Sequence, residues 1–85
     1  MKLWLISQTE NNEYDTYDSA VVAAQTAKQA KQIHPGSRYP QHEDPWLDPY
    51  TPWARTPEAV KARCIGEAAA GVADGEIICA SFNAG

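Results

Sequence analysis

Residues 14–24 read YDTYDSAVVAA, a repeated tripeptide that runs directly into an apolar stretch. The pattern of tyrosine, aspartate and a small hydroxyl residue is written at 14–16 and again at 17–19. Small and β-branched residues follow, and because such residues suit an extended backbone, a strand is predicted over residues 19–25. Its alanines leave space for a group packed close above them. The two copies of the tripeptide, here called the Tyr-Asp doublet, are interpreted either as the loop that leads into this strand or as a binding surface.

An N-terminal strand is predicted over residues 2–7, with the sequence KLWLIS. Alternation places Leu3 and Leu5 on one face, and Trp4 and Ile6 on the other. Because both faces are apolar, we expect this strand at the centre of a sheet or covered on both sides.

The pattern changes to a helical period in TAKQAKQIHPG, residues 26–36. Thr26 and Gln29 have the spacing of a capping box, and apolar residues recur every three positions. Pro35 and Gly36 end the predicted helix, because proline lacks a donor and restricts the residue before it. His34 is expected in the last turn, at the negative end of the helix dipole.

Residues 34–57 differ in composition, since they contain all six prolines of the chain and two of its three tryptophans. Proline cannot donate to a strand ladder, so we predict an ordered excursion here rather than a strand pair. Near its end, the sequence Thr-Pro-Glu at 56–58 has the pattern of a short helical turn.

Two further strands are predicted, one from Val60 and one over about residues 76–82, with Asp74-Gly75 as a tight hairpin turn between them. The order strand, strand, helix, strand, strand predicts one α+β domain over residues 1–85. Its expected architecture is a small antiparallel sheet of about four strands, with one short helix across one face and the long Pro- and Trp-rich loop. The third and fourth strands are expected to be antiparallel neighbours, and the remaining strand order is open.

Composition and charge disfavour several classes of function. The 85 residues carry a net charge of −4, with a pI near 4.9, so direct binding of nucleic acid is disfavoured for lack of a basic stripe. The N-terminal apolar run is too short for a signal peptide or a membrane span, which predicts a cytoplasmic protein. Cys64 and Cys79 are expected to be reduced, buried thiols, and no further ligand spacing indicates zinc.

Acidic and aromatic residues make the segment from Glu10 to Asp18 the first candidate site. A calcium site is disfavoured because the regular alternation of acids and the glycine of such a loop are missing. The structural interpretation is that the aspartates accept backbone hydrogen bonds while the tyrosines cover the core. The functional interpretation is that these residues form a surface that binds a protein partner through a basic patch on that partner. The residues predicted to contact that partner are Glu10, Glu13, Tyr14, Asp15, Tyr17 and Asp18.

Aromatic residues of the Pro-rich segment make the second candidate site. Trp46, Tyr50 and Trp53 either close the open face of the sheet or form a recognition loop, because such rings dominate binding hot spots. A catalytic role is not predicted. Flexible sequence separates His34 from His42, and both cysteines lie within predicted strands, where we expect them to point into the core. No motif for a phosphate, cofactor or metal is present.

The segments KLWLISQ, YDTYDSAVVAA, AKQIHP, VKARCIGEAAAG and ICASFNAG resemble a family of small, largely uncharacterised bacteriophage and prophage proteins. The resemblance covers both ends of the chain and carries no catalytic residue or cofactor. It implies a small acidic protein made in a bacterial host cell, where such proteins often bind and block a host complex.

The leading prediction is therefore a non-catalytic protein-binding module that inhibits a host defence complex by occupying a protein surface or a nucleic-acid groove. Two alternatives stay open. One is a small-ligand module for a nucleotide-like metabolite, walled by the aromatic loop and the alanine-lined strand, with Lys61, Arg63, Arg38 and Arg55 as the cations available for phosphates. The other is self-association through an exposed strand edge.

Overall fold

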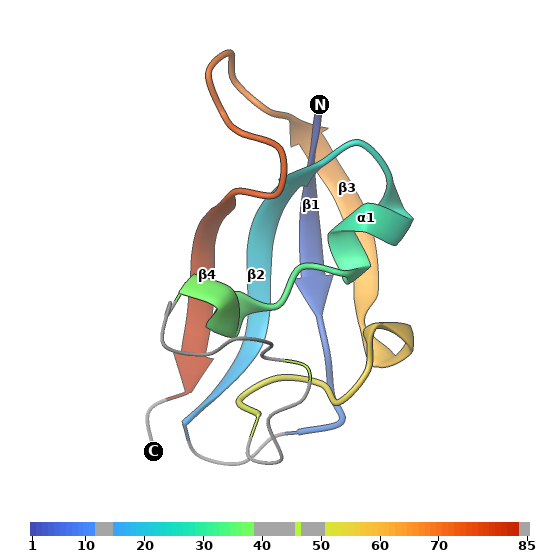
Figure 1. Ribbon diagram of the computed structural model, residues 1–85, viewed down its shortest axis with the longest axis vertical. Coiled ribbons are helices and arrows are strands. Elements are labelled where there is room, and N and C mark those ends of the chain that lie inside the picture. The colour runs from blue at the N-terminus through green and yellow to red at the C-terminus, as the bar shows by residue number, and fades with distance from the viewer. Residues whose placement is uncertain (12–14, 39–45, 47–50, 84–85) are drawn as a thin grey trace.

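The computed structural model describes residues 1–11, 15–38, 46 and 51–83. Its centre is a four-stranded antiparallel sheet in the order β3-β1-β2-β4 (Figure 1). The strands are β1 (Lys2–Ser7), β2 (Thr16–Ala24), β3 (Lys61–Glu67) and β4 (Ile77–Asn83). With one short helix packed on this sheet, the predicted small α+β fold is confirmed.

The two strands predicted from the N-terminal half form the centre of the sheet. β1 pairs with β2 from Lys2↔Ala24 to Ser7↔Ser19, and it pairs with β3 on its other side. β2 begins at Thr16, three residues earlier than predicted, so the second half of the Tyr-Asp doublet lies inside the strand. The Trp4 Nε1–H also donates to the carbonyl oxygen of Ala24 across the pair, at 3.0 Å.

The third and fourth strands lie at opposite edges of the sheet, so the predicted hairpin between them is wrong. Asp74 and Gly75 do form a turn, in which Gly75 has a φ of 84° that favours glycine. However, the Gly75 N–H donates to Ala23 O at 2.8 Å, and the Ala23 N–H donates to Glu76 O at 3.0 Å. The turn therefore leads the chain onto β2, after residues 68–76 have crossed the end of the sheet (Figure 1).

The helix α1 (Ala27–Lys31) follows β2 and is shorter than predicted. Thr26 caps it as expected, because its Oγ1 accepts the N–H of Gln29 at 3.2 Å. Gln32 ends it, and its N–H returns to Ala30 O and Gln29 O. His34 consequently lies beyond the helix, which corrects its predicted place in the last turn. Within the described ranges the chain then forms the 3-10 turns η1 (Pro35–Arg38) and η3 (Pro57–Ala59), and η3 lies at the predicted Thr-Pro-Glu pattern.

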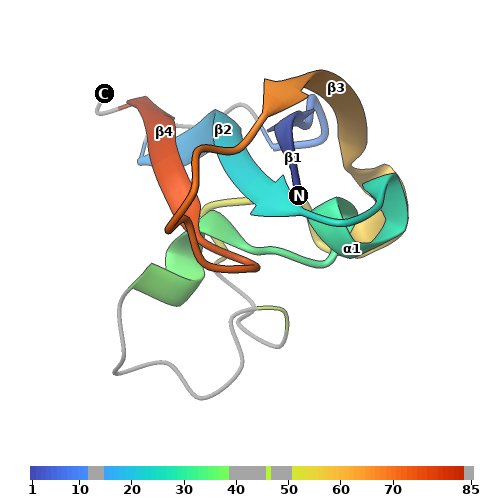
Figure 2. The same cartoon turned by 90° about the horizontal axis from the view of Figure 1, so that it is seen from above.

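One face of the sheet is covered by α1, η1 and the chain that connects them, and Figure 2 shows both helical segments on this same side. The buried core lies beneath them. From the sheet it takes Ile6, Tyr17, Ala20, Val22 and Ala24; α1 contributes Ala30, and the chain on either side of η3 contributes Trp53, Ala54 and Val60. The small residues of β2 thus make room for a tryptophan, as the sequence indicated. The helical segments in the described ranges fall well short of the length and apolar character that a bilayer-spanning helix requires.

Candidate functional site

The described acids of the Glu10–Asp18 segment are exposed, but two of them already have structural partners. The Glu10 Oε1 accepts the backbone N–H of Arg55 at 3.0 Å, and the Asp18 Oδ1 accepts the hydroxyl of Ser19 at 3.2 Å. Asp15 has a φ of 60°, a left-handed conformation that short polar residues tolerate. Glu13 and Tyr14 lie outside the described residues.

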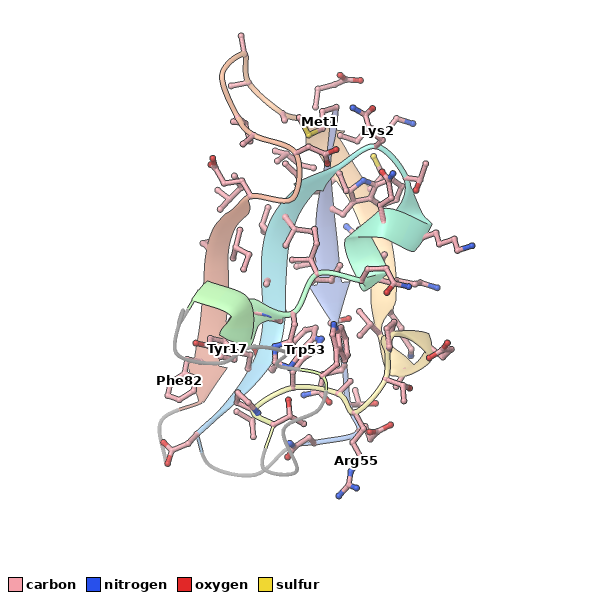
Figure 3. The ribbon with its side chains drawn as sticks, viewed as in Figure 1. Met1, Lys2, Tyr17, Trp53, Arg55 and Phe82 are labelled. Atoms are coloured by element: carbon pink, nitrogen blue, oxygen red, sulfur yellow. The ribbon has the colours of Figure 1, made fainter. Side chains whose placement is uncertain are left out.

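Tyr17 is part of the core rather than of a free surface. Only 6% of it is exposed, and its ring lies 4.9 Å from that of Phe82 (Figure 3). Its backbone N–H donates to Pro52 O at 2.7 Å, which ties the Pro-rich segment to β2. The predicted partner contact at Tyr17 is therefore corrected to a structural role.

Trp46 and Trp53 have different environments. Trp53 is completely buried, so it offers no surface to a partner and its predicted contact is corrected to a core position. Its Nε1 has no hydrogen-bond partner in the part of the chain that the structure describes. Trp46 is half-buried, donates its Nε1–H to Gln32 O at 3.2 Å and lies edge-on to the His34 ring at 4.9 Å. Tyr50 lies outside the described residues.

Gln8 holds the acidic segment in place. It is 3% exposed, and its Nε2 donates to Asn11 O at 2.8 Å and to Tyr17 O at 2.9 Å. The Asn11 N–H donates back to the Gln8 Oε1 at 2.8 Å, and the Asn11 Nδ2 donates to Thr51 O at 2.9 Å. These hydrogen bonds supply donors to buried backbone carbonyl groups, so the acidic segment is held in place by structural contacts of its own.

His34 holds the Pro-rich segment in a similar way. It is 2% exposed, and its Nδ1 accepts the N–H of Gly36 at 2.9 Å. The proton is therefore on Nε2, which lies 2.7 Å from the Thr51 Oγ1 and donates to it. With both ring nitrogens used inside the fold, the geometry gives His34 a structural role.

The sheet face opposite α1, here called the open face, carries no helix in the described ranges (Figure 2). Because Trp4 and Ile6 pack into the core, alternation turns Leu3 and Leu5 to this side, together with Val21 opposite Leu5. All three of the latter side chains are half-buried. The open face is therefore apolar at its centre and accessible.

Cross-strand register orders the rest of the open face in rows. One row consists of Lys61, Ser7, Ser19 and Ser81, and the next of Arg63, Leu5, Val21 and Cys79. Lys61 and Arg63 are exposed on β3, at one edge. Asp18 lies beside Ser19 toward the other end of the same row, through the hydrogen bond that joins them. The open face thus has an apolar centre with cations on one flank and a carboxylate on the other.

Both cysteines are exposed free thiols, so the prediction of buried thiols is wrong. The physical reason is that each lies on an edge strand, Cys64 on β3 and Cys79 on β4, where no further strand covers it in the described sheet. Among the described residues, no group of three or more histidine, cysteine or acidic side chains has the geometry of a metal site.

The pocket expected between the aromatic loop and the alanine-rich strand is filled, because Trp53 and the alanines of β2 belong to one buried cluster. The described cations named for phosphates do not converge on it: Lys61 and Arg63 lie on the open face, and Arg55 points away from the core (Figure 3). A cavity of about 200 Å³ does lie between α1 and η3, lined by Lys28, Lys31, Gln32, Pro57 and Glu58.

The open face is the surface that sequence reasoning did not single out. Its signal was present in β1, whose two apolar faces predicted cover on both sides, although only one face is covered in the described structure. Comparisons of the chain with protein-family models, with curated proteins and with solved structures found no match in any of the three, so the resemblance to phage proteins stays a prediction.

Proposed function

We propose that this protein is a non-catalytic binding module, and that a protein partner docks on the open face of its sheet. The observation that carries the proposal is the half-buried group Leu3, Leu5 and Val21, which occupies the centre of a sheet face that no helix of the described ranges covers. In an antiparallel sheet one face packs on the core and the other is usually polar, so apolar side chains at the centre of the second face mark an interaction surface.

Charge on the open face specifies the chemistry of that partner. Lys61 and Arg63 flank the apolar centre on β3, in a chain whose net charge is −4. A complementary partner presents apolar side chains to the centre, acidic side chains to these two cations and a basic side chain to Asp18. Complementary charges of this kind favour a single orientation and raise the association rate.

The resemblance to phage proteins and the acidic charge support a proposal for where this module acts. We propose that the module acts in the cytoplasm of a bacterial host cell, where it inhibits a host defence complex by occupying a protein surface. Its small size suits this role, because a docking inhibitor needs one face and no catalytic apparatus.

The test is affinity capture of the tagged protein from a bacterial lysate, with mass spectrometry of what is retained. The open-face variants are Leu5→Ala and the double charge reversal Lys61→Glu/Arg63→Glu. The matched control is Lys28→Glu/Lys31→Glu, which reverses two cations of α1 on the opposite side of the sheet.

The proposal predicts one stoichiometric host protein that is retained by the parent chain and by the α1 control, and is lost from both open-face variants. Circular dichroism must show that all variants remain folded. A partner that is retained equally by every variant would place the contact elsewhere, and a partner lost only from the α1 control would move it to the covered side.

A small-ligand module is the second candidate, supported by the cavity between α1 and η3. Its volume of about 200 Å³ lies below the usual range of ligand pockets, roughly 300–1,000 Å³. A thermal-shift screen with nucleotides tests it, since a ligand at about a hundred times its dissociation constant stabilises the fold by about 2.7 kcal/mol. No shift with any nucleotide would leave the protein-binding proposal as the better explanation.

A further inference from the structure

The charge of the open face differs from that of the whole chain. The register places two exposed cations of β3 on this face, Lys61 and Arg63. Asp18 lies at a register shift against β4, so alternation does not place it, but its Oδ1 accepts the hydroxyl of Ser19 at 3.2 Å. Ser19 faces the open side, because it pairs with Ser7 in the unshifted ladder of β1 and β2. These two cations and one carboxylate sum to +1, in a chain whose net charge is −4.

These charges lie on opposite sides of a line that runs along the strands, midway between β1 and β2. The sheet order is β3-β1-β2-β4, so the two cations of β3 lie on one side of this line. Asp18 belongs to β2 and lies on the other side. The apolar centre straddles the line, with Leu5 on β1 opposite Val21 on β2. A half-turn about this line exchanges the two sides, so the open face is complementary to itself in charge and in apolar contact.

We propose that a second copy of this chain docks on the open face, sheet against sheet, about a two-fold axis along this line. The axis brings β1 over β2 of the second copy, so Leu5 of each copy lies over Val21 of the other, and Leu3 borders this contact. All three side chains are half-buried in the single chain, and docking removes their remaining surface from water. Sheets stacked in this way pack about 10 Å apart, with their strands nearly aligned.

Charge favours this axis over the other two-fold axis that a stacked pair of sheets could use. The proposed axis brings β3 over β4 of the second copy, so Lys61 lies over Ser81. From there its long side chain reaches Asp18 on the neighbouring strand of that copy. An axis across the strands, through the row that contains Leu5, would instead place Arg63 opposite Arg63. Like charges that face one another oppose association, so the axis along the strands is the one that the charges support.

The size of the open face sets the strength of this dimer. Four strands about 4.8 Å apart, each with about six residues at about 3.4 Å per residue, give a face of roughly 20 Å by 19 Å, or about 400 Å². A stable interface buries about 800 Å² on each partner, so the dimer is expected to be weak, with a dissociation constant of about 10 μM to 1 mM.

The dimer regulates the face that the proposed function assigns to a host protein, and in this respect it rests on that function. Each copy covers the apolar centre of the other while no host protein is present. Because both occupants use the same surface, a host protein binds the monomer and draws the dimer apart by mass action. Self-association and partner binding are therefore expected to exclude one another.

The experiment measures the mass of the purified chain by sedimentation equilibrium, from about 1 μM to about 1 mM. The variants Lys61→Glu and Asp18→Lys each place like charges at both symmetric contacts. The matched control Lys28→Glu makes the same change in net charge as Lys61→Glu, but on α1 at the covered side of the sheet (Figure 2). We expect dimers of equal strength for the parent chain and the control, and a dissociation constant at least about tenfold higher for each variant. Circular dichroism must show that every chain is folded.

Mixing the two variants tests the symmetry of the contact. In a dimer of one Lys61→Glu chain and one Asp18→Lys chain, the introduced glutamate meets the introduced lysine, and the remaining Lys61 meets the remaining Asp18. Both contacts again join opposite charges, so the equimolar mixture is expected to dimerise about as tightly as the parent chain. A charge effect within one chain cannot give this result, because each chain keeps its own substitution in the mixture.

A parent chain that is monomeric across the whole concentration range overturns the inference. Equal dimerisation of the parent and both variants also overturns it, because the dimer would then use another surface. A mixture that dimerises no more tightly than either variant alone contradicts the proposed axis. Sedimentation uses the purified chain without a host protein. A monomeric parent that still captures a host protein therefore refutes this inference alone, and a dimer that captures none refutes the proposed function alone.

Discussion

Gly36→Ala should destabilise the fold through a single buried ring. A Cβ added at Gly36 would lie 2.9 Å from both Cε1 and Nδ1 of His34, whereas carbon atoms in contact normally stay at least about 3.4 Å apart. The ring cannot withdraw freely, because Thr51 holds its Nε2 at 2.7 Å and Trp46 packs on it edge-on. A displacement of roughly 0.5 Å is needed, which weakens both hydrogen bonds of the imidazole.

The magnitude follows from these contacts. Overpacking of a close-packed site costs about 1–3 kcal/mol, and each weakened hydrogen bond contributes up to about 1 kcal/mol. Replacing glycine by alanine also restricts the unfolded chain, which offsets about 0.4–1 kcal/mol. We expect a net loss of about 2 kcal/mol in the free energy of unfolding, or roughly 8–16 °C in Tm for a chain of this size.

A double-mutant cycle with His34→Ala isolates the cause. In that background the ring is absent, so Gly36→Ala is expected to cost less than about 0.5 kcal/mol by urea denaturation at an unchanged m-value. The reasoning is refuted if Gly36→Ala has the same cost in both backgrounds, or if it is neutral in the parent chain.

Three further substitutions test other parts of the fold by the same denaturation assay. Thr26→Ala removes the cap of α1 and is expected to cost about 1 kcal/mol, whereas Thr56→Ala should be near neutral, because Thr56 makes no side-chain cap bond at η3; equal effects would contradict the assigned cap. Trp53→Ala should cost about 3–5 kcal/mol as a core truncation, and a cost below 1 kcal/mol would show that the ring is not in the core. Gln8→Glu replaces a donor to two carbonyls by an acceptor and should cost more than about 2 kcal/mol, whereas a neutral result would mean that the Nε2 bonds do not form.

Local chemistry made much of this fold predictable from the sequence. The alternation of residues in β1 predicted where that strand begins and ends, and the capping pattern at Thr26 predicted where α1 begins. The alanines of β2 indicated a bulky group above them, and the buried cluster contains Trp53. These features depend on residues near one another in sequence, or on simple volume.

The order of the strands was not predictable in the same way. Asp74-Gly75 has the residues of a hairpin turn, but its backbone bonds join it to Ala23 of β2 rather than to β3. Which edge a strand occupies depends on pairing partners far apart in sequence. The exposure of Cys64 and Cys79 follows from that order, since both lie on edge strands, and it could not be predicted before the order was known.

Whether a side chain is buried also decides whether its substitution can test function. A Trp53→Ala variant that lost a partner would report unfolding as readily as a lost contact, because the side chain is 0% exposed. Lys61 and Arg63 are exposed on β3, so changes at these two positions alter a surface while the core stays intact. Loss of capture after a change at Lys61 or Arg63 therefore reports a lost contact, whereas loss after Trp53→Ala reports either a lost contact or a lost fold.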